Sequence, residues 1–388
     1  MKIGVLKETF PGERRVALTP NLIAPLVKAG HEIIVETSAG QSAGFPDSQY
    51  VEKGAKTVAR SEVFAAELLL QVRGLGANPE AGRADLEHFE RFQTLIALCD
   101  PLSQPQLAKE ISGRGVTLFA LELMPRITRA QSMDVLSSMA TVAGYRAVLL
   151  GATALPKMFP MMTTAAGTIT PAKVFVMGAG VAGLQAIASA RRLGAQVSAT
   201  DVRSAVREQI QSLGARFIET PVEAGKAEGT GGYAKALDDQ TQQLQREAMS
   251  KVVAESDLVI TTAAIPGKKA PILVTKQMVE RMQPGAVLVD LAAERGGNCE
   301  LTKPGQTVMV GGVTILGPDN LPAEVPYHAS QMFGKNVVTF LQHLVGLGLP
   351  GKVNTEDEIT RETLICRDGE LVNSRVRQLL GMDIALAK

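Results

Sequence analysis

The 388-residue chain is 45% hydrophobic, which makes it long and apolar enough for two globular domains of ordinary size. Its 40 Lys and Arg residues nearly balance 39 Asp and Glu residues, and no basic run is interleaved with aromatic side chains, so nucleic acid is not an expected partner. The three cysteines and four histidines are scattered, without the spacing of a disulfide framework or a metal site, and no metal is predicted.

The N-terminal segment, MKIGVLKETF, begins directly with a strand pattern. It lacks a charged region followed by an apolar stretch and a cleavage site, so we expect a cytoplasmic protein. No run of about 18 residues is uninterruptedly apolar, and we therefore expect no transmembrane segment in the chain itself.

Short strands alternate with helices from the N-terminus to about residue 120, a pattern that indicates a parallel sheet covered by helices. Strands are predicted at residues 2–6, 32–36, 68–72, 94–98 and 116–121, and helices at about 19–29, at about 47–53 and from about 104. An apolar stripe at helical spacing then predicts one helix from Thr128 to about Leu150, suited to join two domains.

A second alternating unit begins at Lys173. Its strands are predicted at residues 174–177, 196–200, 215–219, 258–262, 286–292 and 313–317. A helix around residues 331–344 is expected to pack back on the first domain, and Asp368-Gly369 between two short apolar runs predicts a hairpin. We predict an α/β fold of two Rossmann-like doubly wound parallel-sheet domains with a cleft between them: residues 1–128 plus 325–388, and residues 129–324.

The strand at 174–177 is followed by three glycines, Gly178, Gly180 and Gly183, and Asp201 ends the next strand. The glycines permit a tight turn, close approach of backbone N–H groups to a pyrophosphate, and close packing of a helix on the strand. Asp201 can accept hydrogen bonds from both ribose hydroxyls and repels a 2′-phosphate. The context favours an NAD(H) site over a plain strand-to-helix turn.

Several longer segments resemble proton-translocating NAD(P) transhydrogenases, and specifically their peripheral NAD(H)-binding component when it is a separate subunit. They are Pro125-Arg-Ile-Thr-Arg-Ala-Gln-Ser-Met-Asp-Val-Leu-Ser-Ser, Ala143-Gly-Tyr-Arg-Ala, Ala165-Ala-Gly, Gly231-Gly-Tyr-Ala-Lys, Thr261-Thr-Ala-Ala-Ile-Pro-Gly and Gly296-Gly-Asn-Cys. The resemblance covers nearly the whole chain. The wider family includes alanine dehydrogenase, which shares Lys7-Glu8 and the segment Arg14 to Pro20.

The resemblance implies that polar residues orient the dihydronicotinamide ring, chiefly Arg126, Asp134 and Ser137. Gln131 then reaches toward the nicotinamide ribose of a second nucleotide. The remaining residues expected to line the cofactor are Ile127, Thr128, Val181, Val202, Arg203, Gly232, Tyr233, Gln245 and Ala264. The alternative for the first group is a surface ion pair of Arg126 with Asp134, with Ser137 uninvolved.

The segment 227–233 contains three glycines and ends on Tyr233, one of four tyrosines in the chain. We expect it to close over bound nucleotide with Tyr233 as anchor. A flexible surface loop without that role is the alternative.

The resemblance also implies partners. NADP(H) would sit on a second subunit, protons would cross a membrane-embedded subunit, and this chain would form a homodimer in which the segment around 158–170 exchanges between protomers. Attachment to the cytoplasmic face of the inner membrane would come through these partners.

Two rival functions remain open: an alanine dehydrogenase and a non-catalytic NAD(H) sensor. An alanine dehydrogenase resembling this chain would use Arg15, a lysine near 73, a histidine near 97 or 98 and an aspartate near 294. The chain has Arg73, Ala97, Leu98 and Glu294 at those places, and neither Ala97 nor Leu98 can accept a proton. Direct hydride transfer between two nicotinamides needs placement and no acid or base, so the transhydrogenase interpretation is favoured.

Overall fold

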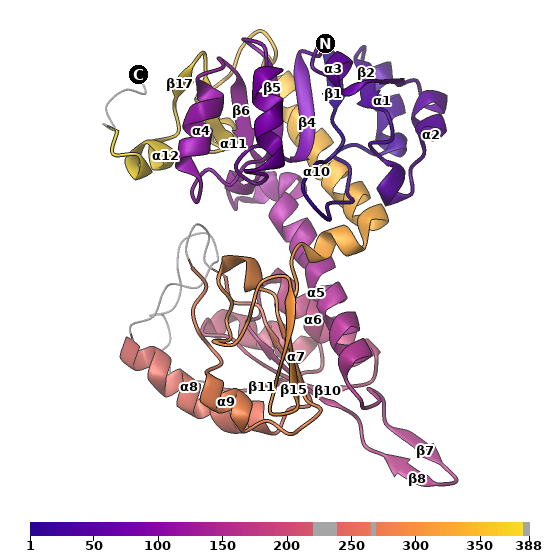
Figure 1. Ribbon diagram of the computed structural model, residues 1–388, viewed down its shortest axis with the longest axis vertical. Coiled ribbons are helices and arrows are strands. Elements are labelled where there is room, and N and C mark those ends of the chain that lie inside the picture. The colour runs from indigo at the N-terminus through magenta and orange to yellow at the C-terminus, as the bar shows by residue number, and fades with distance from the viewer. Residues whose placement is uncertain (220–238, 265–268, 383–388) are drawn as a thin grey trace. The chain divides into compact units, whose positions relative to one another are not determined.

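The computed structural model describes residues 1–219, 239–264 and 269–382. The chain forms two compact units, Met1–Met139 with Pro322–Lys388, and Ala140–Leu321. The first unit takes the indigo-to-violet and the yellow parts of the chain in Figure 1, because both ends of the sequence contribute to it.

The first unit is built on an eight-stranded sheet of order β17-β16-β6-β5-β4-β1-β2-β3. Its strands are β1 (Lys2–Val5), β2 (Glu32–Glu36), β3 (Lys56–Val58), β4 (Leu68–Arg73), β5 (Thr94–Leu98), β6 (Thr117–Ala120), β16 (Leu364–Arg367) and β17 (Glu370–Leu371). The first six pair in parallel in the order 3-2-1-4-5-6, which is that of a doubly wound nucleotide-binding sheet.

Helices cover this sheet and come from both ends of the chain. They are α1 (Ile23–Lys28), α2 (Asp47–Glu52), α3 (Arg60–Val63), α4 (Pro105–Ser112), α10 (Pro326–Gly346), α11 (Glu358–Thr363) and α12 (Ser374–Leu379). The predicted return of the later helix to the first unit is confirmed, because the Phe340 ring of α10 packs edge-on against Phe119 of β6 with centroids 5.7 Å apart. Both rings are fully buried.

The predicted hairpin near the C-terminus is also confirmed. Strands β16 and β17 pair antiparallel, and the two turn residues, Asp368 and Gly369, both have positive φ, 54° and 91°. That geometry is the one that a two-residue hairpin loop requires, and Asp-Gly tolerates it. The hairpin extends the parallel sheet with antiparallel edge strands.

The second unit contains a seven-stranded sheet of order β11-β10-β9-β12-β13-β15-β14. Its strands are β9 (Lys173–Met177), β10 (Gln196–Thr200), β11 (Arg216–Phe217), β12 (Leu258–Thr261), β13 (Val287–Asp290), β14 (Gln306–Val310) and β15 (Val313–Gly317), and its helices include α6 (Val181–Arg192), α7 (Arg207–Ser212), α8 (Asp239–Ala254) and α9 (Lys276–Glu280). The predicted fold class of two mainly parallel α/β sheets is confirmed. The antiparallel edge strand β14 was not predicted.

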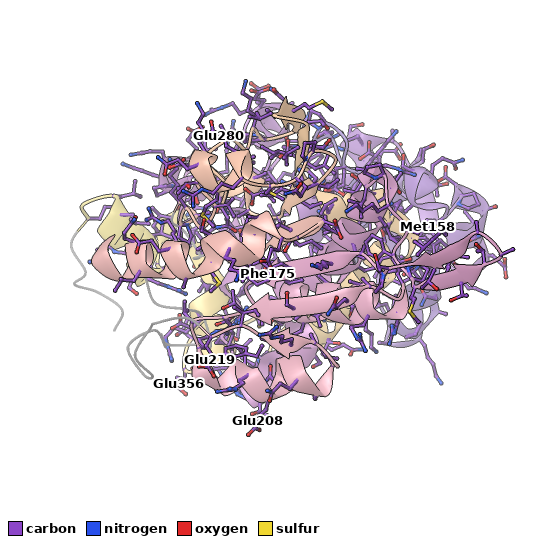
Figure 2. All side chains as sticks on the ribbon, turned by 90° about the horizontal axis from the view of Figure 1, so that it is seen from below. Met158, Phe175, Glu208, Glu219, Glu280 and Glu356 are labelled. Carbon is purple, nitrogen blue, oxygen red and sulfur yellow. The ribbon has the colours of Figure 1, made fainter. Side chains whose placement is uncertain are left out.

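Both faces of this sheet are covered by apolar side chains. Along β9, Val174 and Val176 belong to one buried cluster and Phe175 and Met177 to another, as the two-residue period of a strand requires. In Figure 2 Phe175 lies in the interior, whereas Glu208 projects outward from α7. A strand buried on both faces is typical of parallel sheets.

The predicted helix from Thr128 to Leu150 is wrong at its start. Residues Thr128–Met133 form a 3-10 turn, η5, and helix α5 runs from Val135 to Ala154. The break falls at Asp134, whose Oδ1 accepts the Ser137 N–H at 2.9 Å. An aspartate that caps a helix in this way stabilises its first turn, and here it outweighs the continuous apolar stripe.

Helix α5 is the one helix in the described residues that is long and apolar enough to cross a membrane by length and composition, with a mean hydropathy of 1.3. Its packing gives a different reason for that composition. Ala147 and Val148 are fully buried in the core of the second unit. A Cβ at Gly144 would lie 2.1 Å from the Ala182 carbonyl oxygen of α6, so the two helices approach at backbone distance.

A small hairpin, β7 (Met162–Thr164) with β8 (Gly167–Ile169), was also missed by the sequence analysis. All six strand residues are exposed. Figure 1 shows the hairpin projecting from its unit as an isolated arm. Strands this short, next to the prolines at 156, 160 and 171, give no usable periodicity.

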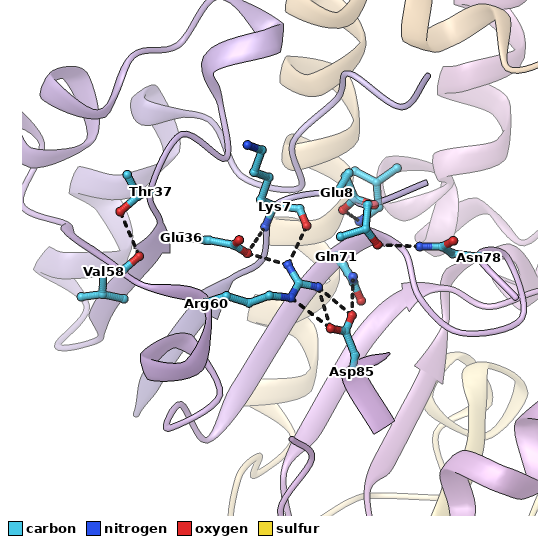
Figure 3. A network of polar contacts seen from close by, with 11 residues as sticks. Lys7, Glu8, Glu36, Thr37, Val58, Arg60, Gln71, Asn78 and Asp85 are labelled. Atoms are coloured by element: carbon cyan, nitrogen blue, oxygen red, sulfur yellow. Dashed lines mark hydrogen bonds and ion pairs between the residues drawn. The ribbon is translucent and has the colours of Figure 1, made fainter. Parts of the chain in front are cut away.

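A charged network holds together the sheet edge in the first unit where β1 and β2 end (Figure 3). The Arg60 guanidinium donates to Glu36 Oε2 at 2.6 Å and to both oxygens of Asp85 at 2.7 Å. It also donates to the Lys7 carbonyl at 3.0 Å. The Asp85 side chain is 6% exposed, so Arg60 is the cation that makes its burial tolerable.

Replacing Arg60 by alanine leaves the Glu36 and Asp85 carboxylates without this cation. We expect a loss of about 3 to 5 kcal/mol in the free energy of unfolding, measured by urea denaturation. Arg83→Ala is the matched control, because Arg83 pairs with Glu110 at the surface with 52% of its side chain exposed. That variant should lose less than about 1 kcal/mol. Equal losses in the two variants would contradict this account of the network.

Candidate nucleotide-binding site

The turn after β9 shows separate reasons for its three glycines. Gly178 has a φ of +100°, a conformation that other residues rarely adopt. A Cβ at Gly183 would lie 1.9 Å from the Gly178 carbonyl oxygen, so helix α6 touches the turn at backbone distance. Gly180 differs from both, because a Cβ there would meet nothing within 4 Å and its φ of −71° is open to any residue. The protein itself gives no reason for glycine at 180.

Gly180 also precedes the first residue of α6, Val181, whose side chain is 37% exposed. The first N–H groups of a twelve-residue helix are therefore presented at this turn. Open space beside a glycine, next to unbonded helix N–H groups, is suited to an anionic group such as a pyrophosphate.

Asp201 follows β10 and lies beside this turn. Its side chain is 5% exposed, and its Oδ2 accepts the Ala179 N–H at 2.7 Å. The Arg203 N–H donates to Oδ1 at 2.9 Å, and the Arg203 side chain bonds both oxygens, at 2.9 and 2.8 Å. Val202 and Arg203 are half-buried. The acid is thus fixed against the glycine turn, as the sequence pattern predicts from the pairing of neighbouring strands β9 and β10.

The strand on the other side of β9 completes this edge of the sheet. β12 follows β9 in space but not in sequence, so the switch point of the doubly wound order lies between them. The Thr262 hydroxyl, directly after β12, donates to the Gly178 carbonyl at 3.0 Å. Ala263 and the exposed Ala264 follow it, which puts Ala264 on the same edge as the glycine turn.

A buried polar cluster that the sequence analysis missed holds this second strand end in place. Asp290, at the end of β13, is fully buried and accepts from the Thr261 and Thr302 hydroxyls and from the N–H groups of Ala292, Asn298 and Cys299. The Asn298 side chain in turn bonds Ala263 N–H at 3.0 Å and Ala263 C=O at 2.8 Å. An acid ending a buried strand was the available signal.

The polar segment around residues 126–137 belongs to the first unit. Arg126, Thr128 and Gln131 are exposed, and Ile127 is half-buried. Asp134 and Ser137 are brought together, since the Ser137 hydroxyl donates to Asp134 Oδ2 at 2.6 Å in addition to the cap.

Two contacts from the C-terminal region of the chain hold the turn η5. The Asn336 amide donates to the Ser132 carbonyl at 2.8 Å, and Arg129 pairs with Asp357 at 2.6 Å. Asp357 also bonds His343 at 2.9 Å. The Arg129 and His343 contacts help to lower the pKa of Asp357 far below its usual value, even though burial works in the opposite direction. The segment is therefore held on its own unit at several points.

Three expected site residues cannot be placed. Gly232 and Tyr233 lie outside the described residues, and so does the segment 227–233 proposed to close over nucleotide. Gln245 lies on helix α8, but its side chain is outside the described region.

In the first unit the corresponding sheet edge carries a cluster of charges. Glu13, fully buried, bonds Arg15 at 2.7 Å and Arg73 at 3.2 Å. Glu8 accepts the N–H groups of Val72 and Arg73, across the switch point between β1 and β4. Burial, and then the charge of Glu13, raise the pKa of Glu8 to about 8. Ala97 is a fully buried strand residue.

Comparison with known proteins gives the family. The domain described as "Alanine dehydrogenase/PNT, N-terminal domain" matches residues 4–143, and "Alanine dehydrogenase/PNT, C-terminal domain" matches residues 147–374. The chain belongs to the alanine dehydrogenase/PNT family. It is 45% identical over 377 residues to the first of the chains named as NAD(P) transhydrogenase subunit alpha in Rhodospirillum rubrum, covering 96% of this chain and 98% of that one.

Two further relatives represent both branches of the alanine dehydrogenase/PNT family. The crystal structure of transhydrogenase from Sinorhizobium meliloti superposes with a TM-score of 0.85 at 44% identity, covering 96% of this chain and 100% of that one. Alanine dehydrogenase of Halomonas elongata is 32% identical over 393 residues, covering 99% of this chain and 98% of that one.

The distinct environments of the glycines generate a test in this alanine dehydrogenase/PNT chain. Gly180→Ala should change the free energy of unfolding by less than about 1 kcal/mol, because its Cβ enters open space. It should weaken NADH binding about tenfold or more, which is about 1.4 kcal/mol, because that space is needed by the phosphates.

Gly183→Ala is the comparison variant, and its Cβ collides with the Gly178 carbonyl. It should lose about 3 kcal/mol of stability. Thermal unfolding without nucleotide and NADH titration by fluorescence separate the two effects. A Gly180→Ala variant that binds NADH like the parent chain would overturn the assignment of this turn.

Proposed function

We propose that this chain is the NAD(H)-binding subunit of a proton-translocating NAD(P) transhydrogenase. The observation that carries the proposal is the open space at Gly180 next to the buried acid Asp201, a pairing suited to a dinucleotide with a free 2′-hydroxyl. Support comes from relatives named as transhydrogenase subunits at 40 to 45% identity over nearly the whole chain. The reaction would be hydride transfer between NAD(H) here and NADP(H) on a partner subunit.

This reaction asks for placement of two nicotinamide rings rather than for proton transfer. Alignment of the reacting atoms at about 3 to 3.5 Å can contribute roughly 7 to 11 kcal/mol to lowering the barrier. In the proposal, Arg126, Asp134 and Ser137 orient the dihydronicotinamide, and Gln131 reaches toward the second nucleotide. Their support is the resemblance, together with the hydrogen bond that ties Ser137 to Asp134.

The partners belong to the proposal as well. A soluble NADP(H)-binding subunit supplies the second nucleotide, since Asp201 disfavours a 2′-phosphate on this chain. A membrane-embedded subunit conducts the protons, and the chain attaches through it to the cytoplasmic face of the inner membrane. The name "subunit alpha" of several relatives fits an assembly of more than one chain.

We also propose a homodimer in which the β7–β8 hairpin docks on a second copy. A two-stranded hairpin without further packing is marginally stable in water. The arm nonetheless carries exposed apolar side chains, Met161, Met162 and Ile169, which are 65%, 38% and 41% exposed. A second protomer would cover them.

The proposal is tested by mixing the purified chain with its NADP(H)-binding partner and measuring reduction of an NAD analogue by NADPH. Turnover is expected. NADH binding without turnover would instead indicate a sensor, and oxidation of L-alanine with NAD by the isolated chain would indicate an alanine dehydrogenase. The last is disfavoured because Ala97 and Leu98 offer no proton acceptor.

Ser137→Ala should lower kcat on the order of tenfold and leave the Kd of NADH within about threefold, because a displaced ring reduces transfer more than binding. The backbone cap to Asp134 persists in this variant. Ser138→Ala, the adjacent serine, is the matched control and should leave kcat unchanged. If both variants behave alike, the orienting role of Ser137 is wrong.

Ile169→Asp should shift the protein from dimer toward monomer in sedimentation velocity experiments, because a charge in a buried interface is costly. Met309→Asp provides the control, since Met309 is 71% exposed on the edge strand β14 and lies outside the hairpin. A dimer that persists in the Ile169 variant, or an equal effect at Met309, contradicts the hairpin interface.

A further inference from the structure

The Asp201 carboxylate is fully engaged by donors of the protein itself. A carboxylate offers about four acceptor positions on its two oxygens. Four bonds fill them: Ala179 N–H and Arg203 Nη2 on Oδ2, and Arg203 N–H and Nε on Oδ1. All four distances lie between 2.7 and 2.9 Å. A ribose diol that uses this acid must therefore replace some of the existing bonds.

Only the two bonds from the Arg203 side chain can be given up at small cost. The other two come from backbone N–H groups, one of them in the glycine turn, and losing them would displace the turn. The Arg203 side chain is 16% exposed, so its guanidinium can move toward water and keep its own hydration. Its two bonds equal in number the two hydroxyls of the diol.

We propose that Arg203 is a specificity-determining residue that occupies the diol position on Asp201 until the ribose displaces it. This inference rests on the proposed NAD(H) site. In NAD(H) the diol takes over the two acceptor positions. In NADP(H) the 2′-phosphate brings about −1.5 to −2 charges against Asp201, and it cannot donate to a carboxylate. Exchange then fails, and Arg203 stays paired with the acid.

The pair therefore contains a latent 2′-phosphate site. A guanidinium is the side chain best suited to bind phosphate through two parallel bonds, and here the neighbouring acid holds it. If the charge at position 201 is removed, a cation remains within reach of the ribose 2′ position. The chain's preference for NAD(H) would then arise from the acid restraining Arg203 as well as from the acid itself.

The test measures the Kd of NADH and of NADPH by nucleotide fluorescence for the parent chain and three variants: Asp201→Asn, Arg203→Gln and the double variant. In Asp201→Asn, NADPH should bind about tenfold more tightly than in the parent chain, and NADH about tenfold more weakly. The double variant should lose the gain for NADPH. Arg203→Gln should keep NADH binding within about threefold, because the diol no longer competes, and should weaken NADPH binding further.

The outcomes separate this inference from the proposed function. A parent chain that binds neither nucleotide refutes the NAD(H) site itself. A parent chain that binds NADH, with no gain for NADPH in Asp201→Asn or with the same gain in the double variant, overturns only the role of Arg203. If Asp201→Asn does not fold, the Arg203→Gln variant still decides: a loss of NADH affinity of tenfold or more would mean that Arg203 supports the acid for ribose binding, contrary to the proposal.

Discussion

The second unit depends on one close contact, the approach of helix α6 to the turn that precedes it. At Gly183 even a methyl group would lie 1.9 Å from the Gly178 carbonyl oxygen, so strand, turn and helix are locked at backbone distance. This contact sets the direction of the first N–H groups of α6. It also sets the position of Ala179, whose N–H fixes Asp201. The acid on the neighbouring strand and the helix N-terminus thus share one geometric origin.

Most of the fold was predictable because it follows from local apolar runs. The strands at 32–36, 94–98 and 196–200 begin and end as predicted, since each run is bounded by polar residues or glycine. The start of α5 was not, because one capping aspartate, Asp134, overrides an apolar stripe that continues through it. Strand β14 was missed because its side chains are largely exposed and give little apolar alternation.

The candidate site divides in the same way. Spacing alone located the glycine turn and Asp201, because consecutive parallel strands put their carboxyl ends on one edge. Spacing could not indicate that Asn298 would hold Ala263, or that Asp290 would collect five donors, because these contacts join distant segments through the tertiary structure. Nor could it show that the Arg203 side chain is folded back on Asp201.

The first unit is discontinuous, since it needs both Met1–Met139 and Pro322–Lys388. During translation the ribosome delivers the whole of the contiguous unit, Ala140–Leu321, before the helix α10 and the strands β16 and β17 that complete the other one. Nascent chains generally fold as domains become available. The N-terminal half of the first sheet must therefore wait, with the β6 edge unpaired, until synthesis is nearly finished, which gives chaperones a defined exposed strand to protect.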